Sequence, residues 1–184
     1  MPSAPLPAGE PAPHFYQRTP SNPRYAFDTA AGRYLVLCFL GSAGDPHARA
    51  ALEAAASRPG FFDDGRAAFF AVSVDPADET EGRVGNRIPG YRVFWDFDLS
   101  VSKLYGSVDE EASPRGQVAA RRFWLVLDPT MRIMASIPFQ PDRSDIATFL
   151  SFVDALPEPA RFAGTELQAP VLVLPGVFEP ALCR

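Results

Sequence analysis

The sequence predicts an α/β/α sandwich with a mixed central sheet, and three observations support this. Two apolar runs, residues 34–40 and 67–74, are rich in β-branched and aromatic residues, as is typical of strands covered on both faces. A helical pattern between them, from 46 to about 57, favours a parallel βαβ unit with a right-handed crossover. A strand hairpin and a last helix follow, so the sheet would contain both parallel and antiparallel pairs.

The N-terminal half begins with a proline-rich arm. Residues 1–23 contain seven prolines, which predicts an extended segment whose first eight residues are flexible. Residues 25–33 are expected to form a turn or short hairpin with its tip at 30–32. The first helix would begin at Asp45 as the N-cap, with Pro46 at the first helical position. Alanine dominates its inner face, so this helix can pack close to the sheet.

The C-terminal half alternates short elements. We expect a short helix over 78–84, a strand over 93–97 and a helical stretch over 100–105 capped by Asp98 or Ser100. Residues 107–120 are polar and predict a surface loop, whereas 121–127 and 132–139 predict a hairpin. A last helix would run from 145 to about 156 with Ser144 as its N-cap. This order is typical of a thioredoxin-like fold, with residues 1–8 as an arm, 9–160 as one domain and 161–184 as a C-terminal extension.

Composition excludes several functional classes. The net charge is −5, from 17 basic and 22 acidic residues, and no basic cluster indicates nucleic-acid binding. No apolar run approaches the ~18–20 residues that cross a bilayer, and the N-terminus lacks the pattern of a secretory signal, so we expect a cytoplasmic protein. The cysteines, Cys38 and Cys183, form no disulfide framework, and His14 and His47 lie far apart in the sequence. We expect no metal and no cofactor.

Four segments occur in an order and spacing that resemble a known family. They are GEPAPHF (9–15), VSVD (72–75), WDFD with LYG (95–98 and 104–106), and RFWLVLDP (122–129). From about residue 9 to 154, the chain thereby resembles a peroxiredoxin of the alkyl hydroperoxide reductase and thiol-specific antioxidant class. The resemblance implies a thioredoxin-like fold. It also implies that the chain forms a homodimer, because peroxiredoxins often do.

The chain departs from this family at the site of its chemistry. Peroxiredoxins reduce peroxide with a cysteine thiolate in a PxxxTxxC loop at the N-terminus of the first long helix, assisted by an arginine. In the matching stretch, 41–48, Gly41 replaces the proline, Asp45 the threonine and Ala48 the cysteine. Arg122 matches the arginine. Without sulfur at position 48, the sulfenic-acid step cannot occur there. The resemblance therefore implies a degenerate domain that serves in interaction or regulation.

Several interpretations of this loop remain open. The loop could bind a small anion, a peptide or a partner domain through the polar residues Ser42, Asp45, His47 and Arg122. We predict that Asp45 and Arg122 form a salt bridge; the alternative is that Asp45 only caps the helix and Arg122 is solvated. A different class of function is an active thiol peroxidase that uses Cys38. A third is a thiol-independent enzyme built on Asp45, His47 and Arg122, although His47 has no evident carboxylate partner and is expected at the surface.

The C-terminal residues 169–184 form an apolar stretch followed by the start of a helical pattern. This stretch resembles the opening strand and first helix of prolyl-hydroxylase-like 2-oxoglutarate, Fe(II)-dependent oxygenase domains, which implies a fused or partner oxygenase domain. The iron-binding HxD…H pattern of those domains is not in this sequence. The alternative is a terminal strand that packs on the domain's own sheet.

Overall fold

A five-stranded sheet forms the centre of the molecule. The computed structural model describes residues 6–87, 89–109, 111–112 and 119–158. The strand order is β5-β4-β3-β6-β7, in which β3, β4 and β5 are parallel and β6 is antiparallel to both of its neighbours. The strands are β3 (Tyr34–Gly41), β4 (Ala67–Ser73), β5 (Tyr91–Trp95), β6 (Phe123–Leu127) and β7 (Ile133–Pro138). The predicted mixed sheet is confirmed.

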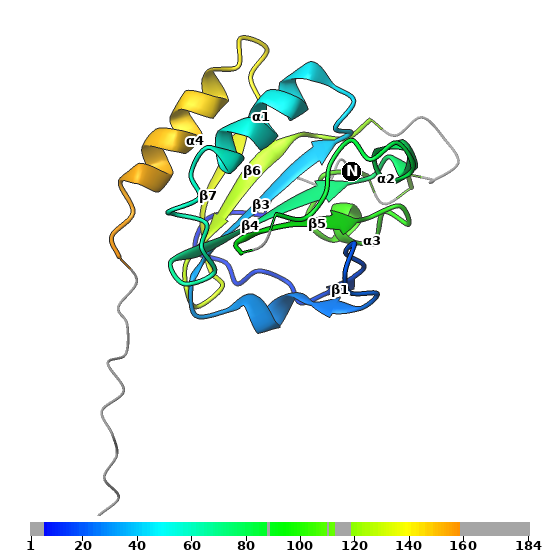
Figure 1. Ribbon diagram of the computed structural model, residues 1–184. Coiled ribbons are helices and arrows are strands. Elements are labelled where there is room, and N and C mark those ends of the chain that lie inside the picture. The colour runs from blue at the N-terminus through cyan, green and yellow to red at the C-terminus, as the bar shows by residue number, and fades with distance from the viewer. Residues whose placement is uncertain (1–5, 88, 110, 113–118, 159–184) are drawn as a thin grey trace, which may run out of the picture.

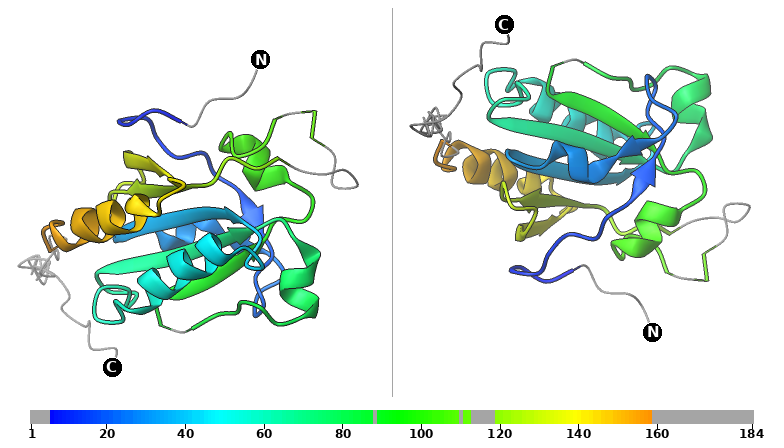
Figure 2. Two further views of the ribbon diagram at one scale, coloured as in Figure 1. Left: turned by 90° about the horizontal axis from the view of Figure 1, so that it is seen from above. Right: turned by 90° about the horizontal axis from the view of Figure 1, so that it is seen from below.

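Helices cover both faces of this sheet (Figure 1). One face carries α1 (Pro46–Ala56) and α4 (Ser144–Asp154), which lie side by side in the view from above (Figure 2). The opposite face carries the N-terminal segment and α3. The elements on that side are β1 (Tyr16–Gln17), β2 (Tyr25–Ala26), the 3₁₀ helix η1 (Phe27–Ala30) and α3 (Ser100–Leu104), and α2 (Pro76–Thr80) follows β4. The molecule is the predicted α/β/α sandwich.

Strand β3 is buried on both faces, which explains its apolar sequence. Side chains alternate along a strand, so Val36 and Cys38 pack under α1 and α4, whereas Leu35, Leu37 and Phe39 pack against the N-terminal segment and α3. All five are at most 1% exposed. The central position of β3 places its carboxyl end, and the loop that follows, at the start of α1.

The segment at 25–33 differs from the predicted hairpin. Residues 25–26 pair with 16–17 as a two-stranded ribbon, and a 3₁₀ helix replaces the expected tip. The reason is aromatic packing: Phe27 is fully buried, stacks on Phe15 and contacts Phe70 and Phe94 edge-on. Burial of one large ring thus fixes a local conformation that the turn residues alone did not predict.

Two predicted helix caps were wrong. Ser144 lies inside α4, whose N-cap is Arg143 in the left-handed region (φ 62°). The N-cap of α3 is Leu99, also left-handed (φ 63°), rather than Asp98 or Ser100. The buried Asp96 accepts hydrogen bonds from the amides of Val101 and Ser102 instead. The first amides of α3 thus have an internal acceptor in Asp96.

Some predictions fall on residues that the structure does not describe. These are residues 1–5 of the predicted arm, half of the 107–120 loop (110 and 113–118), and the 161–184 extension with Cys183. Where the arm is described, the amides of Gly9 and Ala12 donate to the carbonyls of Ile133 and Met131, so it lies along the β6–β7 hairpin. No helix in the described part of the chain is long and apolar enough to cross a membrane.

Candidate functional site

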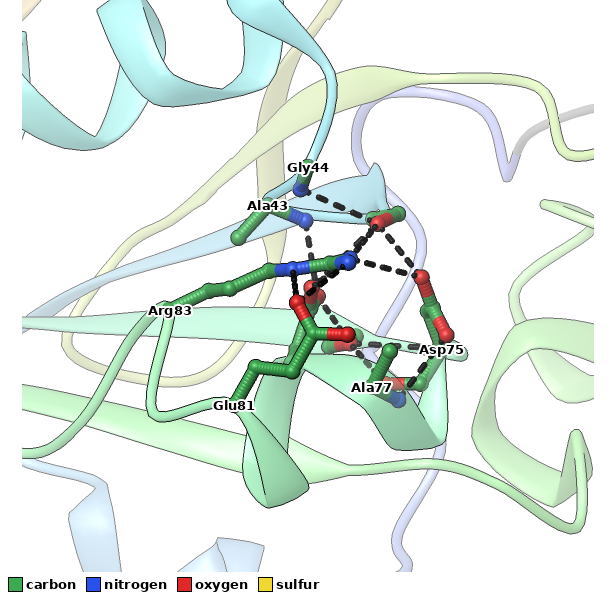
Figure 3. A network of polar contacts seen from close by, with 9 residues as sticks. Ala43, Gly44, Asp75, Ala77, Glu81 and Arg83 are labelled. Atoms are coloured by element: carbon green, nitrogen blue, oxygen red, sulfur yellow. Dashed lines mark hydrogen bonds and ion pairs between the residues drawn. The ribbon is translucent and has the colours of Figure 1, made fainter.

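The loop between β3 and α1 is tied to the next strand and helix by a polar network (Figure 3). Its central acceptor is Asp78 in α2, which is fully buried. Asp78 Oδ2 accepts from the amide of Ala43 and from Ser73 Oγ, both at 2.7 Å. Ser42 Oγ donates to Asp75 at 2.7 Å and lies 3.2 Å from Asp78 Oδ1. The loop conformation therefore depends on carboxylates of another element.

Arg83 compensates the charge of these carboxylates. Its Nη1 lies 3.1 Å from Asp75 and 3.3 Å from Asp78, and a second nitrogen pairs with Glu81 at 2.7 Å. Partial burial would raise the pKa of Asp75, but the hydrogen bond from Ser42 and the charge of Arg83 outweigh it and lower that pKa. Gly44 leaves room for this arrangement, because a Cβ at position 44 would lie 2.7 Å from Arg83 Nη1.

The first turn of α1 is closed by the side chain of Asp45. As predicted, Asp45 is the N-cap and Pro46 occupies the first helical turn. The Oδ1 atom of Asp45 accepts from the amides of His47 at 2.9 Å and Ala48 at 3.0 Å. Helix N-termini attract anions because these amides lack partners within the helix. Here the protein's own carboxylate satisfies them.

Arg122 meets the same oxygen atom. Its Nη1 donates to Asp45 Oδ1 at 2.6 Å, which confirms the predicted salt bridge and excludes a solvated, unpaired Arg122. Partial burial would raise the pKa of Asp45, but the Ala48 amide and the Arg122 guanidinium outweigh it and hold that pKa below its usual value. The methylenes of Arg122 pass 3.8–4.0 Å from the ideal Cβ position of Gly41, which has φ +74°. Gly41 thus combines a left-handed turn with close packing on Arg122.

His47 points away from this ion pair and into the protein. It is 8% exposed, and its Nε2 lies 2.9 Å from Asp145 Oδ1. Its ring stacks on Phe139 with the centroids 4.5 Å apart. The expectation of a surface histidine without a carboxylate partner was therefore wrong. The physical reason is the approach of α4, whose first turn brings Asp145 under the first turn of α1.

Asp145 is the acceptor for a buried set of donors. Besides His47, the indole Nε1 of Trp124 donates to its Oδ2 at 3.1 Å, and the amide of Gln140 donates to its Oδ1 at 2.9 Å. Trp124 in turn stacks on Phe149 of α4, with the centroids 3.9 Å apart. Asp145 is 1% exposed. This network fastens α1, β6 and α4 together beneath the loop.

Cys38 lies in the sheet below the site. It is fully buried, pairs with Ala71 and Trp124 of the flanking strands, and faces α1. Burial raises the pKa of the Cys38 thiol well above its usual value, and the negative charge of Asp145 acts in the same direction. The thiolate is the reactive form of cysteine. Cys38 is therefore protonated and shielded at neutral pH.

The structure brings together only part of the predicted set. Asp45, Arg122 and the amides of His47 and Ala48 meet at one point, whereas Ser42 turns to the network around Asp78 and His47 turns to Asp145. Sequence reasoning missed Asp78, Arg83 and Asp145. The sequence did contain a signal for a second capped helix near the loop. Asp75-Pro76 begins α2 in the same way that Asp45-Pro46 begins α1. The described residues contain no group of three or more side chains that could hold a metal ion.

Comparison with solved structures defines the class of fold. A yeast mitochondrial 1-Cys peroxiredoxin superposes with a TM-score of 0.66 at 21% identity, covering 82% of this chain and 76% of its own. The peroxidoxin BcpB of Mycobacterium tuberculosis superposes with a TM-score of 0.65 at 17% identity, and the match covers 82% of this chain and 98% of BcpB. The AhpC of the same organism superposes with a TM-score of 0.63 at 16% identity, and the match covers 83% of this chain and 93% of AhpC. These similarities show a thioredoxin-like fold of the peroxiredoxin kind.

Comparison of sequences defines the family. The sequence model of the AhpC/TSA family matches residues 8–136, which are 129 of the 184 residues. The chain belongs to the AhpC/TSA family. A comparison with curated protein sequences gave no match.

Proposed function

We propose that this chain is a degenerate peroxiredoxin-like domain, without peroxidase activity at the start of α1, that serves as an interaction or regulatory module. One observation carries the proposal. The amide of Ala48 and the guanidinium of Arg122 both donate to Asp45 Oδ1, at 3.0 and 2.6 Å. In the family's motif these positions would surround a cysteine thiolate. Here an internal carboxylate takes their hydrogen bonds and an alanine stands where the thiol would be.

The charge balance of this loop disfavours a reactive anion. A thiolate or a deprotonated peroxide near Asp45 would meet a carboxylate whose lowered pKa keeps it ionised at neutral pH. Like charges at contact distance disfavour ionisation of the second group. An anionic ligand would have to displace Asp45 from both Arg122 and the helix amides. The Asp45–Arg122 ion pair thus occupies the position where an anion would bind. A partner would contact the surface around this ion pair.

The two enzyme hypotheses have weaker support. The Cys38 thiol is fully buried with a raised pKa, so it lacks both access and ionisation. A thiol-independent enzyme would need Asp45, His47 and Arg122 to face one substrate, but the His47 ring is directed to Asp145. A homodimer, which is common in this family, and a fused or partner oxygenase domain remain proposals for partners, as does a cytoplasmic location.

Treatment with peroxide tests the absence of thiol chemistry. We expect no Cys38-dependent sulfenic acid when the 184-residue chain, as a Cys183→Ser variant, is treated with micromolar hydrogen peroxide and a sulfenic-acid trapping reagent. The reason is that the buried thiol stays protonated. Intact mass spectrometry would detect an adduct, with Cys38→Ser as the blank and the denatured protein as the positive control. Rapid trapping on Cys38 in the folded protein would overturn the proposal.

Restoring the motif tests the assignment of the loop. In a Cys183→Ser background, Ala48→Cys combined with Asp45→Thr should give a new thiol whose pKa lies below the ordinary value of about 8.5. Arg122 and the helix amides would then be free to stabilise the thiolate. The single change Ala48→Cys is the matched control. Its thiol should have a higher pKa than that of the double variant, because Asp45 still occupies those donors and repels a second negative charge.

The ultraviolet absorbance of the thiolate, followed as a function of pH, gives both values. A double variant whose thiol titrates at or above 8.5, or no difference between the two variants, would mean that position 48 does not correspond to the family's cysteine. In that case the proposed loss of function would lose its structural basis, even if the protein consumed no peroxide.

A further inference from the structure

A groove runs beside the C-terminal half of α1, away from the Asp45 loop. Its larger part is a cavity of about 270 Å³, and its mostly apolar lining consists of Ala55, Ala56, Pro59, Phe62, Arg87, Pro89 and Tyr91. A smaller cavity of about 140 Å³ adjoins it, and Arg87 and Tyr91 line both. The combined volume of the two cavities lies in the lower part of the ~300–1,000 Å³ range typical of small-molecule sites.

The far wall of the groove is fixed by close backbone packing. Gly90 has φ +82°, and a Cβ there would lie 1.9 Å from the carbonyl oxygen of Phe62. Its own carbonyl accepts from the amide of Phe69 at 2.7 Å, and Arg87 and Tyr91 exchange backbone hydrogen bonds at 2.9 and 3.1 Å. These contacts hold Tyr91 and Arg87 in place without a ligand. The groove is therefore preformed, as ligand sites usually are.

Two polar groups at the junction of the cavities lack partners. The ring of Tyr91 is largely buried, whereas its hydroxyl is not among the buried polar atoms and has no hydrogen-bond partner in the described part of the chain. Burial raises the pKa of the Tyr91 phenol, so at neutral pH it remains protonated and able to donate. The guanidinium of Arg87 lies 5.7 Å from the centre of the Tyr91 ring, and within the described ranges it forms no ion pair. A hydroxyl donor and an arginine without an ion pair among the described residues thus both line the two cavities.

We propose that this groove binds a small amphipathic carboxylate. The apolar body would occupy the cavity between Ala55, Ala56 and Phe62, and the carboxylate would accept from Arg87 and from the Tyr91 hydroxyl. Charge-assisted hydrogen bonds of this kind are stronger than neutral ones. The smaller cavity is also lined by Arg49 and Glu53, whose charges balance, so Arg87 keeps the charge around the head group positive. Residues 46 and 55 are ~13 Å apart along the helix axis, so this site does not depend on the function proposed for the Asp45 loop.

The test uses 3-phenylpropionate as the probe and the ¹⁵N-labelled chain of 184 residues. Amide signals of Ala55, Ala56 and Tyr91 should shift in a saturable manner, which gives the dissociation constant. Arg87→Gln should weaken binding about tenfold, because it removes the positive charge from the head group. Arg24→Gln is the matched control: Arg24 also lies over a tyrosine ring, that of Tyr16, but outside the groove. Its dissociation constant should equal that of the unaltered chain.

A neutral analogue separates charge recognition from apolar binding. 3-Phenylpropanamide has the same body without the charge and should bind about tenfold more weakly than the carboxylate. Equal binding of amide and carboxylate would overturn the assignment of ligand class. The absence of saturable shifts at the groove, or equal weakening by Arg87→Gln and Arg24→Gln, would overturn the site. Arg87 is on the surface, so its substitution leaves the fold intact, and the dispersion of the amide spectrum checks this.

Discussion

Gly90→Ala is expected to lower the free energy of unfolding by about 3–5 kcal/mol. The added methyl would lie 1.9 Å from the carbonyl oxygen and 2.2 Å from the carbonyl carbon of Phe62, and both atoms belong to the backbone. A flexible side chain could move aside, whereas this backbone cannot without displacing Phe62, which is 3% exposed. The left-handed φ of +82° adds a further penalty for any residue with a Cβ.

Gly60→Ala is the control for this prediction. Gly60 has no atom within 4 Å of its ideal Cβ position, and its φ does not lie in the left-handed region. Its substitution should change the free energy of unfolding by less than about 1 kcal/mol. Chemical denaturation followed by tryptophan fluorescence measures both. A Gly90→Ala protein as stable as Gly60→Ala would show that residues 62 and 90 are not packed as described.

Asp145→Ala is expected to lower the free energy of unfolding by a similar amount, about 3–5 kcal/mol. The substitution removes the shared acceptor of three buried donors: His47 Nε2, Trp124 Nε1 and the amide of Gln140. Each donor left without a partner retains its desolvation cost. Since these donors belong to α1, β6 and the segment before α4, the loss would loosen the packing of both helices on the sheet.

Asp142→Ala provides a comparison at the same end of α4. Asp142 is exposed and accepts only from the amide and hydroxyl of Ser144. Its loss should lower the stability much less than Asp145→Ala, because its hydrogen bonds to Ser144 are exposed and water can replace them. Differential scanning calorimetry of the two variants would separate these effects. If Asp145→Ala were no more destabilising than Asp142→Ala, the buried network would contribute little to stability.

The elements of the sheet could be predicted from the sequence because their signals are local. The apolar runs that became β3 and β4, and the alanine periodicity of α1, reflect burial on known faces. The Asp45–Arg122 pair was predicted from the resemblance to a family motif rather than from the residues alone. The left-handed caps at Leu99 and Arg143 were missed, since neither residue is a usual choice for that conformation.

The contacts of His47 could not be predicted because they are not local. Asp145 lies 98 residues away in the sequence, and only the docking of α4 beside α1 brings the two together. The same holds for Asp78, which is 35 residues from Ala43. A carboxylate inside a short helix carries no sign in the sequence that it is buried. Both residues were identified only once the packing of helices on the sheet was known.

The alanine face of α1 has a consequence for how this helix is positioned. Ala48, Ala51 and Ala55 present a nearly smooth surface to the sheet, with few side-chain ridges to interlock with those below. Such an interface allows sliding and tilting at little steric cost, so the ends of the helix determine its place. One end is held by Arg122 on Asp45 and by Asp145 on His47, and the other by the Arg58–Asp154 pair just beyond it. Because the Arg58–Asp154 pair is exposed and the contacts at the first turn are partly or fully buried, the polar contacts at the start of α1 determine its place on the sheet more than those at its end.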